Sequence, residues 1–277
     1  MRRWISLAWA VAFVATAHPA FPGVFAQATP SKYSLTVKPG EPVSRDIAIG
    51  NQGDGAVVVR VRLSDWMLDE RGELDFVPAG TTPVSLQGLV SFEPSEFSLG
   101  PGESGVIHVT MRLPADGPPT RWGVLLSEVR PAVWPKTSLG PRAIAELGTT
   151  LYLSRIPAGA TRAELAGMDV FPSGDTTFAV AVRVRNPGGR HFYSSGEIAV
   201  RDTAGRTVTS GKLGTAVVLP GAQRVFTWTC DTRVPPGLYT VTATLDTGEP
   251  ELIVGETGVR WPLPRLVPAP LAQQDPR

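Results

Sequence analysis

The sequence predicts an all-β protein made of two tandem immunoglobulin-like β-sandwich domains. Three observations lead to this fold class. Several segments alternate apolar and polar residues with a period of two, which is typical of half-buried strands. Gly (29) and Pro (27) are spread through the 277 residues, as turns between many short strands require. The turn residues of the first half also recur, in the same order, in the second half.

Four segments carry the clearest alternation, and we expect an antiparallel strand at residues 56–66, 103–113, 176–185 and 237–245. In the first segment Val57 and Val59 share one face, while Arg60 and Arg62 share the other. One face of such a strand packs on a core, and the other meets solvent. We expect Trp66, at the end of this segment, to be buried at the heart of the first sandwich, facing the opposite sheet.

Three turn signals repeat along the chain. An aromatic residue that follows a Pro/Gly corner and begins a penultimate strand fits the immunoglobulin-like plan. We therefore expect one domain over residues 32–157 and a second over residues 158–262. The matching pairs are Asn51 and Asn186 at strand ends, Gly102 and Gly221 in Pro-Gly turns, and Trp122 and Tyr239 after Pro-rich corners.

The N-terminal segment has the pattern of a secretory signal. Arg2 and Arg3 precede an uncharged apolar run over residues 4–17, which is too short to span a bilayer comfortably. Ala26-Gln27-Ala28 then offers small residues at both positions that a signal peptidase requires. We expect residues 1–28 to be removed, so that the mature protein begins at Thr29 and is periplasmic or secreted. The Pro-rich tail over residues 263–277 is expected to be disordered.

Charge and residue usage exclude several functions. The 26 basic and 25 acidic side chains leave a formal charge of +1, which argues against nucleic acid as a partner. The sole cysteine, Cys230, excludes an intrachain disulfide and lies in a strand-like run, so we expect a buried, unreactive thiol. After residue 28 only His108 and His191 remain, in different domains and without metal-ligand spacing. We expect no enzyme activity, no cofactor and no small-molecule substrate.

A group of acidic residues leaves one alternative open. Five carboxylates within eleven residues could converge on calcium. Their spacing matches no calcium loop, and the run Glu70-Arg71-Gly72-Glu73 is typical of a solvated hairpin turn. The sequence does not decide whether this acidic turn binds calcium. The five residues are Asp65, Asp69, Glu70, Glu73 and Asp75.

The first predicted domain resembles the N-terminal domain of periplasmic pilus-assembly chaperones, which consist of two immunoglobulin-like domains. Residues 43–51 are similar to the second strand of that family, which ends in Asn, and residues 59–66 to the third, which closes on Trp. Residues 92–104 are similar to its Pro-rich approach and Pro-Gly turn. Residues 124–131, the long connection after them and residues 143–153 are similar to its sixth strand, variable loop and seventh strand. The second domain agrees only in being another sandwich.

The resemblance implies that the last strand of the first domain is added to an incomplete sandwich of a client protein. Equally, this strand could be an ordinary final strand that faces its own core. In the family an Arg and a Lys anchor the client's terminal carboxylate, but those positions fall at Leu35 and near Thr150, which carry no charge. The residues expected to bind a client are Ala143, Ala145, Leu147, Thr149, Leu151 and Leu153.

Two functions are compatible with these patterns. The first is an exported, chaperone-like protein that assists assembly or secretion of a surface or outer-membrane protein by β-strand addition. The alternative is a structural or adhesive immunoglobulin-like module of a cell-surface assembly. Either could also associate with itself through an edge strand. If the strand binds a client, Leu147 and Leu151 should be partly exposed in the free protein.

Overall fold

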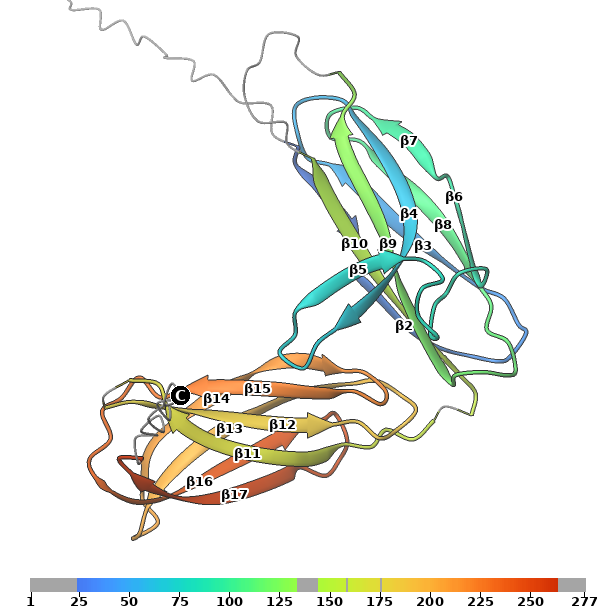
Figure 1. Ribbon diagram of the computed structural model, residues 1–277. Helices are drawn as coiled ribbons and strands as arrows, with labels where there is room; N and C mark the ends of the chain where they lie inside the picture. Colours follow the sequence, from blue (N-terminus) through green and yellow to red (C-terminus); the bar gives the residue numbers. More distant parts are fainter. Residues whose placement is uncertain (1–23, 134–143, 158, 175, 264–277) are drawn as a thin grey trace, which may run out of the picture.

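The computed structural model describes residues 24–133, 144–157, 159–174 and 176–263. The regular secondary structure of these residues consists of β-strands, which form two β-sandwiches in tandem (Figure 1). The all-β fold class with two immunoglobulin-like sandwiches is therefore confirmed. Within these ranges no helix has the length and apolarity that a membrane crossing needs.

The first sandwich packs two sheets against each other. One has the strand order β1-β3-β8-β6, and the other has the order β2-β10-β9-β4-β5, with β7 paired to β4. Between them lies a core of fully buried side chains that includes Ile47, Ile107 and Leu125. The strands are β1 (Ala26–Thr29), β2 (Lys32–Val37), β3 (Val43–Asn51), β4 (Val57–Leu68), β5 (Leu74–Pro78), β6 (Val90–Glu93), β7 (Glu96–Leu99), β8 (Ser104–Met111), β9 (Thr120–Pro131) and β10 (Ala145–Arg155).

The second sandwich faces a sheet of order β11-β12-β15 against one of order β14-β13-β16-β17. Phe178, Val241 and Leu245 fill its core. Cys230 is fully buried in the same core, which confirms the expected burial of the thiol. The strands are β11 (Glu164–Pro172), β12 (Phe178–Arg185), β13 (Phe192–Asp202), β14 (Thr207–Val218), β15 (Gln223–Thr229), β16 (Gly237–Asp246) and β17 (Ile253–Trp261).

The period-two patterns fold as expected. In β4, Val57 and Val59 are buried while Arg60 and Arg62 are exposed. The strands expected at residues 103–113, 176–185 and 237–245 are β8, β12 and β16. At the start of β16 the Tyr239 hydroxyl donates a hydrogen bond to the carbonyl of Pro235, four residues upstream, at 2.7 Å. This contact is the tyrosine corner of immunoglobulin-like domains.

The repeated turns form the same hydrogen-bonded corner in both domains. The Asn51 side-chain amide donates to the carbonyl of Gly55 at 2.8 Å, and its amide oxygen accepts from the N–H of Gly53 at 3.1 Å. Asn186 makes the corresponding bonds to the carbonyl of Arg190 at 2.9 Å and the N–H of Gly188 at 2.9 Å. Both asparagines are buried. A buried amide that satisfies loop carbonyls in this way explains why the same residue recurs at both strand ends.

The chain crosses from one sheet to the other near its N-terminal end. β1 pairs antiparallel with β3, and after Pro30 the chain joins the facing sheet as β2, parallel to β10. Ala26 and Ala28 are half-buried against the core. Cleavage after Ala28, as expected from the sequence, would remove three of the four residues of β1.

Trp66 is buried, with 4% of its surface exposed, but it does not lie between the two sheets of the first sandwich. Its ring packs on Trp122, with centroids 6.4 Å apart, and on Tyr152, with centroids 5.9 Å apart. Leu219 of the second domain completes this cluster. The expectation that Trp66 faces the opposite sheet is wrong, because this outer face of its sheet is covered by the second domain.

Candidate functional site

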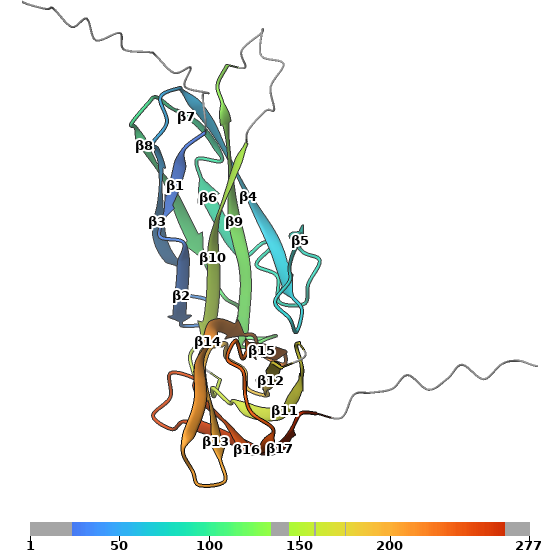
Figure 2. The same ribbon diagram turned by 90° about the vertical axis from the view of Figure 1, so that its left-hand side faces the viewer.

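β10 forms the edge of its sheet over part of its length (Figure 2). It pairs with β9 from Ala145 to Ser154, but with β2 only from Thr150 onward. The N–H of Thr150 donates to the carbonyl of Ser31 at 3.0 Å, so this residue directs its backbone groups away from β9. Because that direction alternates along a strand, the N–H and C=O of Glu146 and Gly148 point to the same side. Among the described residues no strand pairs with them there.

The six residues expected to bind a client divide into three groups. Ala143 lies outside the described residues. Ala145 and Leu147 are half-buried at the margin of the core, while Leu151 and Leu153 are fully buried within it. The buried Thr149 donates its hydroxyl hydrogen to the carbonyl of Pro30 at 3.0 Å. The expected partial exposure of Leu151 is therefore wrong, because Leu151 faces the core where β2 closes this edge.

Apolar surface borders the open part of the edge. Ala26 and Ala28 of β1 line the margin from the facing sheet, as Ala145 and Leu147 do from β10. At the same end of the sandwich Phe25 is 68% exposed and Ile144 is 55% exposed. Unpaired backbone groups beside a half-buried apolar margin can bind an extended segment that supplies both hydrogen bonds and alternating apolar side chains.

The outer face of the open edge is polar. Glu146 projects from this face and forms a 2.7 Å ion pair with Arg62 of β4, and both side chains are largely exposed. Such a pair contributes little to stability because water screens it. Position 146 therefore tolerates substitution, while its backbone N–H belongs to the open edge.

At the other end of the open edge, a positive charge stands beside Thr150. The parallel register places Lys32 of β2 opposite Thr150, and the Lys32 Nζ lies 4.0 Å from the centroid of the Tyr193 ring in the second domain. Leu35 instead packs half-buried on the core. The charge absent from Leu35 and Thr150 is thus present on Lys32. In the sequence Lys32 lies near the expected position but matches it only after a shift, and the pairing of β2 with β10 leaves no local pattern that would justify the shift.

The domain junction surrounds His191, which immediately precedes β13. Only 8% of His191 is exposed, and its ring stacks on Tyr152 of β10 at 4.0 Å between centroids with a 19° interplanar angle. Its Nε2 lies 3.3 Å from the Oγ of Ser34. Burial, together with the nearby charges of Arg190 and Lys32, lowers the pKa of His191 from its usual 6.5 to about 4. The imidazole is therefore neutral near pH 7.

The acidic residues do not converge on one point. Asp65 is fully buried and accepts hydrogen bonds from the N–H and hydroxyl of Thr82 and from the hydroxyl of Ser85. Asp69 accepts from the N–H groups of Gly72 and Glu73 in the β4–β5 turn. The hairpin turn expected at Glu70 to Glu73 is confirmed. In the described ranges no three Asp, Glu, His or Cys side chains are grouped as metal ligands.

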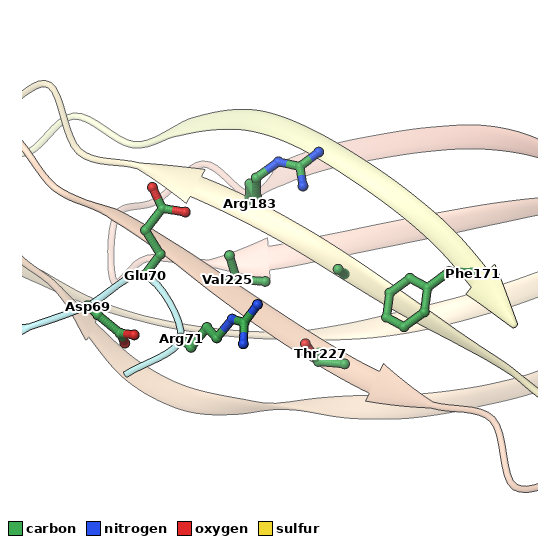
Figure 3. A pocket seen from close by; sticks show the side chains of 8 residues that line it. Asp69, Glu70, Arg71, Phe171, Arg183, Val225 and Thr227 are labelled. Carbon is green, nitrogen blue, oxygen red and sulfur yellow. The ribbon is translucent and has the colours of Figure 1, made fainter. Parts of the chain in front are cut away.

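The tip of the β4–β5 hairpin contacts the second domain. The N–H of Val225 in β15 donates to the carbonyl of Glu70 at 2.7 Å. A Cβ at Gly72, whose φ is +95°, would collide with the guanidinium of Arg224. A groove of about 700 Å³ lies beside this contact, and Figure 3 shows Arg71 extending over β15 toward Thr227. The contact attaches the second domain to the sheet that contains β10.

Comparison with known proteins finds similarity to solved structures but not to sequences. No protein-family model matches the sequence, and no curated protein matches it. Solved structures do match. The chain resembles pilus chaperones.

Three of these structures show the extent of the likeness. The CsuC–CsuE chaperone–tip adhesion subunit pre-assembly complex from Acinetobacter baumannii has 13% identity and a TM-score of 0.46, covering 83% of this chain and 97% of that chain. The YadV chaperone has 13% identity and a TM-score of 0.44, covering 84% and 99%. The E. coli chaperone DraB has 15% identity and a TM-score of 0.43, covering 84% and 98%.

Proposed function

We propose that this chain is an exported, non-enzymatic chaperone that holds a client protein by β-strand addition to the open edge of β10. One observation carries the proposal. The backbone N–H and C=O of Glu146 and Gly148 point to a side where no strand of the described residues pairs with them, directly beside the half-buried Ala145 and Leu147. Natural sheets usually cover or charge such an edge, so an open edge with an apolar margin favours a binding role.

The client is an extended segment of an incomplete β-sheet protein, such as a subunit of a surface or pilus-like structure. Its backbone would pair with Glu146 and Gly148, and its alternate side chains would cover Ala145, Leu147 and the alanines of β1. The fully buried Leu151 and Leu153 stay in the chaperone's own core and take no part. Binding is therefore limited to the first part of β10.

Lys32 supplies the charge for a second contact. A client segment that ends near Thr150 would bring its terminal carboxylate close to Lys32. The register of β2 and β10, in which Lys32 is the partner of Thr150, supports this contact. Hydrogen bonds between ionised groups are stronger than neutral ones and would fix the register of the client. The arginine–lysine pair of the resembling family would thus be replaced by a single lysine.

The N-terminal segment supports a location outside the cytoplasm, in the periplasm or beyond. Its arginine pair and its apolar run are typical of a secretory signal. A structural or adhesive module would share this location, but it would have no reason to bind an isolated extended segment. Peptide binding therefore separates the two functions.

The test uses a synthetic peptide of alternating apolar and polar residues with a free terminal carboxylate, and a scrambled peptide of the same composition. Of the backbone hydrogen-bonding groups of β10, proline at position 146 removes only the N–H that points to the open side, because the ladder to β9 uses Ala145 and Leu147. We expect Glu146→Pro to weaken binding of the alternating peptide at least about tenfold, measured by fluorescence anisotropy, because a lost backbone bond costs about 1 kcal/mol and the ring blocks approach.

Glu146→Ala is the matched control, since it removes the same side chain and the ion pair to Arg62 but keeps the N–H. It should bind the peptide as the unchanged protein does, and circular dichroism should show both variants folded. An amidated peptide should bind more weakly than the free acid to the unchanged protein and equally to Lys32→Ala. Equal peptide binding by the Pro and Ala variants, or no preference over the scrambled peptide, would refute the proposal.

A further inference from the structure

The junction between the domains buries a histidine, His191, on nearly every side. His191 lies at the end of the corner organised by Asn186, whose amide donates to the carbonyl of Arg190 at 2.9 Å. The corner thereby fixes the backbone just before His191 and directs the imidazole onto the first domain. No role in the proposed client site requires a histidine here.

The contacts of His191 cross the domain boundary. Its ring stacks on Tyr152 and its Nε2 lies 3.3 Å from the Ser34 hydroxyl oxygen, so β10 and β2 of the first domain both contact it. The neighbouring Gly189 accepts a 2.6 Å hydrogen bond from the hydroxyl of Thr120 in β9. The Nδ1 of His191 is buried without a partner among the described residues. A neutral ring that carries its hydrogen on Nε2 tolerates these surroundings, whereas protonation would add a charge and bury an Nδ1–H without an acceptor among the described residues.

The charges that face His191 are all positive. Lys32 approaches from β2, above the ring of Tyr193 in β13, and Arg190 precedes it in the same corner. Tyr152 on β10 and Ser34 on β2 are neutral near pH 7. In the described part of the chain no carboxylate lies within ion-pair distance of this imidazole. A proton added to His191 therefore meets repulsion from Lys32 and Arg190, with no carboxylate among the described residues to pair with it.

We propose that the domain junction is an acid-sensitive clamp, in which protonation of His191 releases the second domain from the first. This goes beyond the proposed chaperone function and does not depend on it. Release moves His191 from Tyr152 and Ser34 into water, where it can hold a proton. The protonation of His191 thereby determines below which pH the two sandwiches lose their fixed arrangement.

The direction follows from the pKa values. The pKa of His191 is about 4 in the closed junction and returns to 6.5 once the ring is exposed. The released state therefore binds more protons between these values, and closure weakens as pH falls from about 6.5 toward 4. Between pH 7.5 and pH 5 the ratio of closed to released molecules should fall by a factor on the order of 30.

The experiment follows the distance between the domains by energy transfer between dyes on cysteines at the exposed positions Ser44 and Thr203, since Cys230 is buried. Urea is added until the domains separate, at pH 7.5 and at pH 5. We expect separation at clearly lower urea at pH 5, and no such shift in His191→Gln. His108→Gln is the matched control, because His108 is exposed beside Asp46 and should leave the shift unchanged.

A second measurement is independent of any variant. Proton NMR of the unchanged protein should give His191 a pKa far below 6.5. An ordinary pKa for His191, an absent pH shift in the unchanged protein, or an undiminished shift in His191→Gln would each overturn the clamp. If the domains of His191→Gln are separated at every pH, the variant gives no pH shift to compare. The pKa of His191 from the NMR titration of the unchanged protein then supports or overturns the clamp by itself.

Discussion

Two leucines on the same face of β10 should respond in opposite ways to the same charge. Leu151 is fully buried where β10 pairs with β2, whereas Leu147, four residues earlier on the same face, is half-buried at the open edge. Leu151→Asp loses about 2–3 kcal/mol of side-chain burial and adds the several kcal/mol of an unpaired buried carboxylate. That sum is comparable to the whole stability of a domain, about 5–15 kcal/mol. We expect Leu151→Asp to unfold the first sandwich.

Leu147→Asp should cost only about 1–2 kcal/mol, because its carboxylate reaches water at the margin. In a client complex the same carboxylate would be covered, so binding of the alternating peptide should be lost while the fold remains. Urea unfolding followed by tryptophan fluorescence checks the stability, since Trp122 pairs directly with Tyr152 of β10. Unfolding by Leu147→Asp would show that the edge is part of the core, and peptide binding by a folded Leu147→Asp would show that the wrong strand was chosen.

Two further predictions concern elements away from the edge. The sequence alone predicts a mature start at Thr29, but β1 (Ala26–Thr29) pairs with β3 in the first sandwich. From the structure we therefore predict an earlier cleavage, with a mature chain that begins before Val24, and mass spectrometry of the exported protein should show this; a start at Thr29 would mean that the fold does without Ala26 to Ala28. Asn186→Ala leaves the carbonyls of Arg190 and Val218 and the N–H of Gly188 without their hydrogen-bond partner inside the second domain. Calorimetry should therefore show that the free energy of unfolding of that domain alone falls by about 2–4 kcal/mol. An unchanged second transition would contradict the role of the corner.

The strands and corners were predictable because their signals are local. Alternation in β4 requires only neighbouring residues, and the two asparagine corners each lie within a few residues of their bonding partners. The same alternation places position 66 on the face of Ser64, outside the sandwich. The expectation that Trp66 lies inside rests only on its size, since a large aromatic side chain is normally buried in a core. A second domain that covers the outer face also buries it, and no local pattern shows that.

The candidate site was only partly predictable for a related reason. The sequence located β10 and its alternating residues, and it left open whether they face a client or the core. In the structure the first part of β10 has an open edge that a client could reach, and the part from Thr150 onward pairs with β2 and faces the core. Neither the end point of β2 nor the position of Lys32 beside Thr150 follows from residues near β10 in the sequence.

The pairing of β2 with β10 joins the two ends of the first domain. The hydroxyl of Thr149 bonds to the carbonyl of Pro30, 119 residues earlier, and six further register positions follow along the two strands. Contacts between such distant residues close a long loop and form late in folding. If the chain is exported across a membrane with its N-terminus leading, β2 emerges long before β10. The sheet therefore cannot be completed until β10 has also crossed the membrane. The strand that carries the open edge would thus become available at the same step that completes the domain.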